Sequence, residues 1–463
     1  MELKKYKLGE ILDVTRGASL SGKFYAAKGE YVRLTCGNFD YQNNCFKENK
    51  AKDNLYYIGD FKPDFLMKEG DIITPLTEQA IGLLGSTAII PESGKYIQSQ
   101  DVAKIVCKEH LLDKDFAFYL ISSNLVKQQL SAAAQQTKIR HTSPDKIKDC
   151  IVWIPELEEQ KRIGKLLRTI DLKIELNRQL NHNLEAMAKQ LYDYWFVQFD
   201  FPDENGKPYK SSGGKMVWDK RLKREIPLLW KAKIVEEVAD VYNGATPSTV
   251  NELNYGGDIV WITPKDLSDQ KQKFVYQGER NISQVGYDSC STHLLPSNTI
   301  LMSSRAPIGL LAIAKTELCT NQGFKSFVSK SKNIATYLYY YLQYHITQIE
   351  QLGTGTTFKE VSREDILKFP MLKPSDNVLD LWEEIVSALN DRQLEIQKEN
   401  ENLIKQRDEL LPLLMNGQVS VNYDLAETGF ILFCISIATK ICFQLIKSII
   451  VNSVLIIAFY INP

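Results

Sequence analysis

Residues that build metal sites and disulfides are scarce in this sequence. The chain has 463 residues but only five histidines and eight cysteines, which stand at positions 36, 45, 107, 150, 290, 319, 434 and 442. No two cysteines have the CxxC spacing, and no histidines cluster beside them. This pattern argues against a zinc site and against a disulfide framework. We therefore expect no bound metal and a reducing compartment.

The sequence also lacks a charge excess of either sign. It carries 56 lysines and arginines against 57 aspartates and glutamates, for a net charge of −1. This balance gives no sign of a polyanionic partner, so any nucleic-acid surface has to be local. One stretch is locally basic, because residues 207–233 contain nine lysines and arginines but only Asp219 and Glu225 as acids. Two interpretations stay open for it: a solvated linker, or a surface that contacts phosphates.

Uninterrupted apolar runs of membrane-spanning length are missing as well. The N-terminal segment, MELKKYKLGEIL, has no apolar stretch of signal-peptide length, so we expect a cytoplasmic protein. The tail from Gly429 is rich in apolar residues, but Lys440 and Lys447 divide it. A spanning helix needs about 20 consecutive apolar residues. The tail is therefore either a membrane anchor or an extension produced by reading past an ordinary end.

The chain is longer than one hydrophobic core usually supports, and its sequence contains an internal duplication. Residues 8–19, LGEILDVTRGAS, align with residues 235–246, VEEVADVYNGAT, and this alignment places Gly17 on Gly244. Further along, AIGLL aligns with PIGLL, TSPDKI aligns with VSREDI, and Pro155 falls on Pro374. The offset between the copies drifts from 227 to 219, as expected if loops changed length.

Each copy consists of a globular body followed by a long helix. The bodies mix alternating, β-rich stretches such as GDIVWIT with short helical segments and Gly, Asn and Pro punctuation. We predict an α+β protein with two similar globular α/β domains, separated by two long antiparallel helices and related by a pseudo-two-fold duplication. The expected boundaries are 1–155 for the first globular domain, 156–200 for the first helix, 201–230 for a connector, 231–375 for the second globular domain, 376–417 for the second helix, and 418–463 for the tail, with an atypical hydrophobic extension from 429.

The two predicted helices carry matching apolar stripes with the alternating three- and four-residue steps of a coiled coil. The residues expected to pack along the seam are Ile163, Ile170, Leu184, Leu191, Leu389, Ile396, Leu403 and Leu410. Polar Asn177, Gln393 and Asn400 fall on or beside the seam, where buried amides fix the register. A lone helix would expose its stripe to water, so we predict that the two pair. The alternative is that each helix packs only on its own body.

The length of these helices suits measurement along a duplex. Forty residues at about 1.5 Å each make a rod of about 60 Å. Two turns of B-DNA span about 68 Å, at about 34 Å per turn. A rod with a similar body at each end would hold two readers about two helical turns apart.

The order of these segments, and several strings within them, resembles the specificity subunits of Type I restriction-modification systems. The resemblance covers about residues 5–425. IPELEEQKRI resembles the family's entry to its first spacer helix, and LYDYWFVQFDFPDENGKPYK resembles its central connector. WITPKDL, SSRAPIGLLAIA, TNQGFKSF, GTGTTFKEVSREDI and LLPLLMNGQVSV resemble recurrent segments of its second half. The tail after about Glu427 departs from the family.

This resemblance implies a DNA-binding adaptor that has no catalytic residues of its own. In the family each body is a target-recognition domain that reads one half of a bipartite site, and the helix pair sets the gap. The implied partners are double-stranded DNA, two DNA methyltransferase subunits and the restriction and translocase subunits, with no small-molecule substrate. S-adenosylmethionine, ATP and magnesium are expected on those partner subunits, and no cofactor is expected on this chain.

The catalytic motifs sought in the sequence are missing. It has no GxxxxGK[ST] phosphate loop and no GxGxxG opening a helix. GTGTT, at residues 353–357, is not followed by Lys-Ser/Thr, which favours a tight turn near DNA over a phosphate cradle. One string, Pro144-Asp145 with Glu159-Gln160-Lys161, formally matches the nuclease pattern PD…ExK. Glu159 falls in the first turn of a helix, where an acidic side chain interacts favourably with the helix dipole. We prefer this role for Glu159 over metal-dependent cleavage.

Candidate DNA contacts are basic, amide and hydroxyl side chains in polar loops, because phosphates supply affinity and base edges supply specificity. In the first body the candidates are Gln79, Gln98, Gln100, Lys138, Arg140 and His141. In the second body they are Lys265, Ser303, Ser304, Arg305, Asn321, Gln322, Lys325 and Thr356. Glutamine amides suit adenine, and Arg305 suits a guanine edge or a phosphate. For any one of these residues, ordinary surface or loop-capping duty is an equal alternative.

Functions of two other classes stay open on the sequence alone. One is a coiled-coil scaffold that residues 429–463 hold to a membrane. The other is a nuclease that uses the PD…ExK string.

Overall fold

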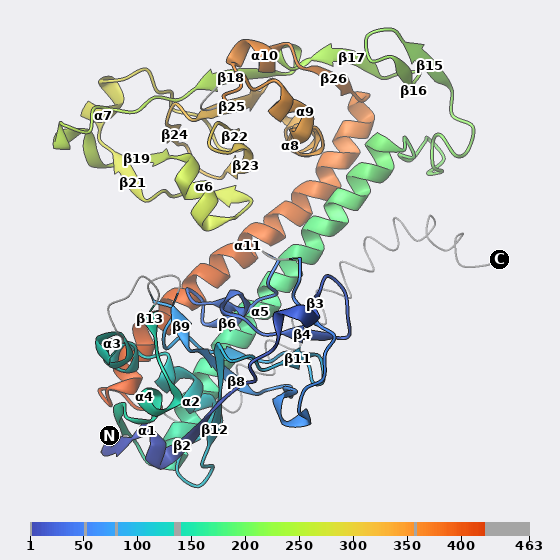
Figure 1. Cartoon of the computed structure of the whole chain (residues 1–463). Helices are drawn as coiled ribbons and strands as arrows, with labels where there is room; N and C mark the ends of the chain where they lie inside the picture. Colours follow the sequence, from blue (N-terminus) through green and yellow to red (C-terminus); the bar gives the residue numbers. More distant parts are fainter. Residues whose placement is uncertain (1, 51–52, 79–81, 134–139, 356–358, 422–463) are drawn as a thin grey trace. The chain divides into compact units, whose positions relative to one another are not determined.

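The computed structural model describes residues 2–50, 53–78, 82–133, 140–355 and 359–421. The described chain divides into two compact units, the first made of residues 1–176 and 400–421 and the second of residues 177–399 (Figure 1). Each unit therefore contains one globular body together with a segment of both long helices. The hydrophobic tail from Gly429 lies outside the described residues.

The first body is built on a four-stranded antiparallel sheet with the order β10-β8-β12-β2. Its strands are β2 (Leu12–Arg16), β8 (Ile72–Pro75), β10 (Ala88–Ile89) and β12 (Val102–Cys107). A second sheet, β11-β4-β7-β3, contains β3 (Tyr25–Ala26), β4 (Tyr31–Arg33), β7 (Tyr56–Tyr57) and β11 (Tyr96–Ile97), and pairs β11 with β4 in parallel. Every residue of β8 is buried, as expected for a central strand.

Short helices complete the first body. They are α1 (Leu8–Ile11), α2 (Lys114–Ile121), α3 (Asn124–Ala133) and α4 (Pro144–Lys148). Side chains cap two of them, because Asp113 accepts from the backbone N–H of Phe116 and Ser143 accepts from that of Lys146. Most of α2 is buried, and it packs in one core cluster with Leu12 and Ile105 of the sheet.

The second body repeats this plan. Its main sheet has the order β18-β25-β22-β23-β20, from β18 (Ala239–Asn243), β20 (Phe274–Val275), β22 (Ile300–Ser304), β23 (Ile308–Ala314) and β25 (Phe324–Ser329). Its smaller sheet joins β21 (Arg280–Ile282), β19 (Tyr255–Ile262) and β24 (Cys319–Thr320), with β19 and β24 parallel. The helices are α6 (Pro264–Gln270), α7 (Gln284–Asp288), α8 (Ala335–Tyr344), α9 (Ile346–Gln351) and α10 (Arg363–Leu367).

Aligned positions in the two bodies have the same strand pairing and the same close backbone contacts. In each body the entering strand pairs antiparallel with the leaving strand: β1 (Lys4–Lys7) with β14 (Ile151–Ile154), and β17 (Lys231–Ile234) with β26 (Pro370–Lys373). A Cβ on Gly17 would lie 2.3 Å from the carbonyl oxygen of Gln98, and one on Gly244 would lie 2.2 Å from that of Thr320. Only glycine fits such an approach, so the aligned glycines have a steric cause. The predicted duplication is confirmed.

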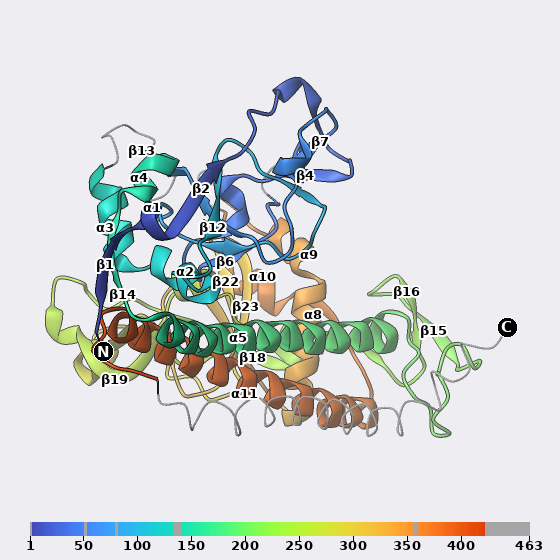
Figure 2. The same cartoon turned by 90° about the horizontal axis from the view of Figure 1, so that it is seen from below.

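The long helices are α5 (Leu157–Tyr192) and α11 (Asp376–Met415), and they run antiparallel (Figure 2). In the first unit Ile170 and Ile174 of α5 pack against Leu403 of α11. In the second unit the side-chain amide of Asn181 donates to the carbonyl oxygen of Gln393. Within the second unit, Asn177 of α5 donates to Glu399 of α11, and the later Asn181 donates to the earlier Gln393, so the helices run in opposite directions there. The buried amides Asn177, Gln393 and Asn400 lie in this seam.

The C-terminal end of each long helix lies in a globular core: that of α5 in the second body and that of α11 in the first. Leu184, Ala188 and Tyr192 of α5 belong to the core cluster of the second body, and Leu414 and Met415 of α11 belong to that of the first. The alternative that each helix packs only on its own body is therefore wrong. Burial of both helix ends in globular cores supplies the packing that a polar helix needs for stability.

Candidate nucleic-acid interface

In the first body, a short two-stranded ladder holds Arg140 at the surface. β13 (Arg140–His141) pairs with β9 (Thr77–Glu78), which follows the buried strand β8. A guanidinium nitrogen of Arg140 lies 3.6 Å from Oε2 of Glu78 and donates to the hydroxyl of Ser131 at 3.0 Å. Glu78 is itself buried, and its Oε1 accepts from the backbone N–H of Gly82 at 2.8 Å. The carboxylate is thus fixed in the fold, while 38% of the Arg140 side chain stays exposed.

The glutamines of the first body separate into structural and exposed side chains. Gln98 is buried and its amide donates to the carbonyl oxygens of Thr15 and Val102. Gln100, two residues later, is exposed, and its carbonyl oxygen accepts from Nε of Arg16 at 2.9 Å. The Gln100 side chain is therefore exposed, whereas the Gln98 side chain is held within the fold. Gln79 and Lys138 lie outside the described residues.

In the second body, the equivalent place holds Arg305 and Glu360. A guanidinium nitrogen of Arg305 lies 3.6 Å from Oε2 of Glu360, and the ammonium of Lys325 lies 3.3 Å from Oε1 of the same carboxylate. Lys325 and Ser304 are buried, whereas Arg305 is half-exposed. Ser303 is also buried and donates to the carbonyl oxygen of Pro307 at 2.7 Å.

Three of the candidate contacts are thus occupied within the fold. Ser303, Ser304 and Lys325 form a buried support beneath Arg305 rather than an exposed surface, because β22 and the first residues of β25 are buried on both faces. The strings that contain them resemble recurrent segments of the family, but resemblance does not tell which side chains of a strand reach solvent. Thr356 lies outside the described residues.

Each body carries an arginine–glutamate ion pair at this place, but the paired residues do not occupy aligned positions. The alignment of AIGLL with PIGLL places Glu78 on Arg305, whereas the alignment of TSPDKI with VSREDI places Arg140 on Lys359 and His141 on Glu360. The backbone shifts the first match by one residue, since Thr142 donates to the carbonyl oxygen of Leu76 and Val361 to that of Ser304. The guanidinium stands on the returning segment in the first body and on the outgoing segment in the second. The corresponding segments of the two bodies therefore carry different polar side chains.

Of the other candidates in the second body, Asn321 and Gln322 lie in the turn between β24 and β25, and Lys265 lies in the first turn of α6. Gln322 is exposed, and its side-chain oxygen accepts a hydrogen bond from the hydroxyl of Thr246. Asn321 turns its side-chain oxygen onto the backbone N–H of Gly323 at 2.8 Å. Lys265 pairs with Glu279 at 2.8 Å, and both side chains are 65% exposed. Solvent screens such an exposed pair, so the lysine is readily released to another anion.

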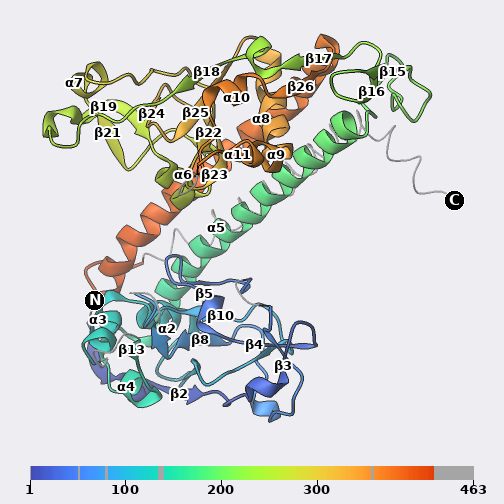
Figure 3. The ribbon, with the colours of Figure 1, turned by 45° about the horizontal axis from the view of Figure 1, so that its top comes forward.

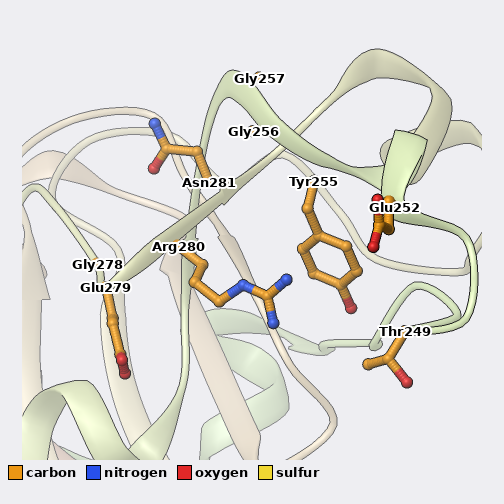
Figure 4. Close-up of a pocket in the computed structure, with 9 residues that line it drawn as sticks. All are labelled: Thr249, Glu252, Tyr255, Gly256, Gly257, Gly278, Glu279, Arg280 and Asn281. Carbon is orange, nitrogen blue, oxygen red and sulfur yellow. The ribbon is translucent and has the colours of Figure 1, made fainter.

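A groove of about 760 Å³ beside Glu279 adds residues that the sequence did not single out (Figure 4). The guanidinium of Arg280 lies 4.1 Å from the centre of the Tyr255 ring, and the Tyr255 hydroxyl donates to the carbonyl oxygen of Pro247. Figure 4 shows the two side chains facing each other from β21 and β19. The register of this strand pair shifts between Tyr255 and Ile259, which marks a β-bulge or similar irregularity. The sequence does not predict this irregularity.

A buried lysine joins the second body to both helices. The ammonium of Lys273 lies 2.7 Å from Oε2 of Glu185 on α5 and donates to the side-chain oxygen of Asn390 on α11 at 2.7 Å. It also donates to the hydroxyl of Tyr340 on α8 at 2.6 Å. Burial lowers the pKa of Lys273 to about 8, although Glu185 opposes the shift. In the first unit, Arg407 of α11 pairs with Asp171 of α5 at 2.9 Å, and Tyr119 of α2 donates to the same carboxylate.

Lys273 gives the second unit a pH-dependent stability. Its folded pKa of about 8 lies below the unfolded value of about 10.4. The unfolded chain therefore binds more protons between these values, and this contribution to stability rises with pH across that window. Tyrosines and cysteines titrate in the same range, so the quantity to measure is the difference between wild type and Lys273→Met in urea unfolding. We expect wild type to gain roughly 3 kcal/mol relative to the variant across the window. Parallel profiles for the two proteins would contradict this account.

The nuclease-like string does not form a metal site in the part of the chain that the structure covers. Glu159 lies 3.2 Å from a guanidinium nitrogen of Arg162 and accepts from the backbone N–H of Val421. Lys161 pairs with Glu158 at 2.7 Å. Among the described residues, no three His, Cys, Asp or Glu side chains are grouped so that they could hold a metal ion. The same residues include no helix that is long and apolar enough to cross a membrane.

Known proteins share this architecture. The sequence profile of the Type I restriction modification DNA specificity domain matches residues 1–186 and 227–406, once for each half of the duplication. The Type I restriction enzyme HindI specificity subunit of Haemophilus influenzae is 24% identical over 90% of this chain and 99% of that subunit. The MjaIX specificity subunit of Methanocaldococcus jannaschii is 35% identical over 41% of this chain and 46% of that subunit.

A solved structure agrees at the level of the fold. The S subunit of a Type I restriction-modification system from M. genitalium superposes with a TM-score of 0.60 and 15% identity, covering 90% of this chain and 96% of that chain. The two matched segments of the family profile include both bodies and most of both long helices. The chain therefore belongs to the Type I restriction modification DNA specificity family.

Proposed function

We propose that this chain is the specificity subunit of a Type I restriction-modification complex and reads a bipartite DNA target. Each body reads one half-site, and the antiparallel pair α5 and α11 sets the gap between them. The observation that carries this proposal is the duplication itself: two bodies of one topology carry different polar side chains in corresponding segments, Glu78 with Arg140 in the first and Arg305 with Glu360 in the second. Two readers of different sequence joined by a spacer suit a target with two unlike halves.

The catalytic work belongs to partner subunits in this proposal. The partners are two DNA methyltransferase subunits, which bring S-adenosylmethionine, and restriction subunits, which bring ATP-driven translocation and magnesium-dependent cleavage. This chain recognises the DNA target and takes no small-molecule substrate. Its expected place of action is the cytoplasm, where both the DNA and these partners are found.

The proposed DNA contacts are the exposed side chains of the two bodies. In the first body they are Gln100, Arg140 and His141, together with Gln79 and Lys138, which lie outside the described residues. In the second body they are Lys265, Arg305, Asn321 and Gln322, together with Thr356, which also lies outside the described residues. Ser303, Ser304 and Lys325 take a supporting role, because their polar atoms hold the segment that carries Arg305.

Substituting one arginine at a time tests whether each body reads its own half. Arg140→Ala and Arg305→Ala, each in the assembled methyltransferase complex, are measured against duplexes in which every base pair of the target is varied. We expect Arg140→Ala to relax discrimination in one half-site and Arg305→Ala in the other, by about 1–3 kcal/mol at the contacted base pair. If either arginine contacts a phosphate, affinity falls equally for all sequences and the salt dependence becomes shallower.

The two variants serve as controls for each other. Each retains the other arginine, the helix pair and the same partner subunits, so loss of assembly would affect both half-sites together. A complex of wild-type chain that shows no sequence preference would refute the proposed function. If both variants read every base pair as wild type does, the function stands and the assignment of these two residues fails.

A further inference from the structure

The locally basic stretch 207–233 folds into an exposed hairpin. β15 (Met216–Asp219) pairs antiparallel with β16 (Arg224–Pro227), and both strands stand next to the β17 and β26 pair (Figure 3). Ile226 and Trp230 are buried, and Tyr209 stacks on Phe201 with ring centres 4.6 Å apart. The stretch therefore forms a folded hairpin anchored on the second unit, so it is not a solvated linker.

The hairpin carries an excess of exposed cations, with Glu225 of β16 as an exposed acid among them. Lys215, Lys220 and Lys223 are exposed and enter no ion pair with any residue that the structure describes. Asp219 at the turn is occupied, because its Oδ1 accepts from the backbone N–H groups of Arg221 and Leu222. The turn thus uses its one carboxylate to fix its own shape and presents lysines to the outside.

Apolar side chains are left uncovered beside these lysines. Trp218 is 64% exposed and Leu229 is 72% exposed. Arg224, by contrast, lies over the Phe199 ring at 4.7 Å and helps to hold the hairpin in place. Exposed aromatic and apolar residues rimmed by unpaired cations are typical of an interaction surface. Exposed lysines without ion-pair partners among the described residues fit a polyanion, although the whole chain has a net charge of −1.

We propose that the β15–β16 hairpin is a third DNA contact, which binds backbone phosphates of the duplex without reading sequence. This inference rests on the proposed function, since it adds a phosphate contact to the two reading bodies. Lysine ammonium groups on flexible stems suit phosphates as point charges. Such contacts add affinity and fix position but carry no base specificity.

Salt dependence tests the hairpin directly. In the assembled methyltransferase complex, we compare wild type with Lys215→Gln, Lys220→Gln and Lys223→Gln combined. Each lost phosphate contact should make the slope of log affinity against log salt shallower by about 0.9, up to about 2.7 for all three. Affinity for the target and for unrelated duplex should fall by the same factor. The matched control replaces the same three lysines with arginine, which keeps the charge and should keep the wild-type slope.

The possible results separate the hairpin from the proposed function. An unchanged slope in the glutamine variant, with wild type binding its target, would overturn the hairpin contact alone. Loss of methyltransferase from the purified complex, with an unchanged slope for the complexes that remain, would identify an acidic protein surface as the partner and also overturn it. Absence of specific DNA binding by the wild-type complex would instead refute the proposed function.

Discussion

One heptad inserted into both long helices should lengthen the recognised gap by about three base pairs and leave both half-sites unchanged. Seven helical residues add about 10.5 Å, at about 1.5 Å per residue, and each base pair of duplex adds about 3.4 Å. Two facing positions suit the insertion, after Leu176 in α5 and after Glu399 in α11, because the hydrogen bond that Asn177 donates to Glu399 at 2.7 Å then stays intact on one side of both insertions. A heptad keeps the apolar stripe in phase, so the seam can re-form. The gap is read from the methylation pattern of the variant complex.

A five-residue insertion at the same positions is the control. It rotates the stripe by about 140°, at about 3.6 residues per turn, and should disrupt pairing rather than reset the gap. If the heptad variant instead recognised different half-site bases at the original gap, the helices would not be the spacer.

Replacing Arg407 with methionine should cost the first unit about 3–5 kcal/mol of unfolding free energy, because it leaves a buried carboxylate without its cation. The Arg407 and Asp171 side chains are only 9% and 16% exposed, and their charged atoms are 2.9 Å apart. Tyr119 donates to the same carboxylate at 2.6 Å, but a neutral hydroxyl does not replace a charge. Urea unfolding of the purified chain measures the loss.

Neutralising both partners should recover most of that loss. Asp171→Asn combined with Arg407→Gln removes the two charges together, and such double replacements are often near neutral. Lys405→Met is the matched control on the same helix, because its side chain is 74% exposed, and it should change stability by no more than about 0.5 kcal/mol. Equal losses for Arg407→Met and Lys405→Met would show that the ion pair contributes nothing.

Much of the architecture could be predicted from the sequence, because it depends on sequence features that are periodic or repeated. The aligned Gly17 and Gly244 occupy the same close approach, and most of the predicted stripe residues of α5 and α11 are buried, with Leu191 and Leu410 partly buried. The amide of Gln160, within IPELEEQ, donates to the carbonyl oxygens of Leu111 and Pro155, and this fixes the start of α5 on the first body.

The candidate contacts were harder to predict, because exposure is set by neighbours that a sequence does not show. Gln98 and Gln100 look alike in the string QSQ, yet one side chain is buried and the other is exposed. Ser303 and Ser304 read as a polar loop, but β22 is buried along its whole length. The Lys273 network draws on α5, α8 and α11, so no local pattern could reveal it.

The most direct test of the proposed function is the methylome of cells that lack this chain. Deleting its gene while retaining the partner genes should abolish adenine methylation at one bipartite motif and leave all other motifs methylated. Restoring the gene should return methylation to the same motif. An unchanged methylome after deletion, with the methyltransferase still present, would contradict the account.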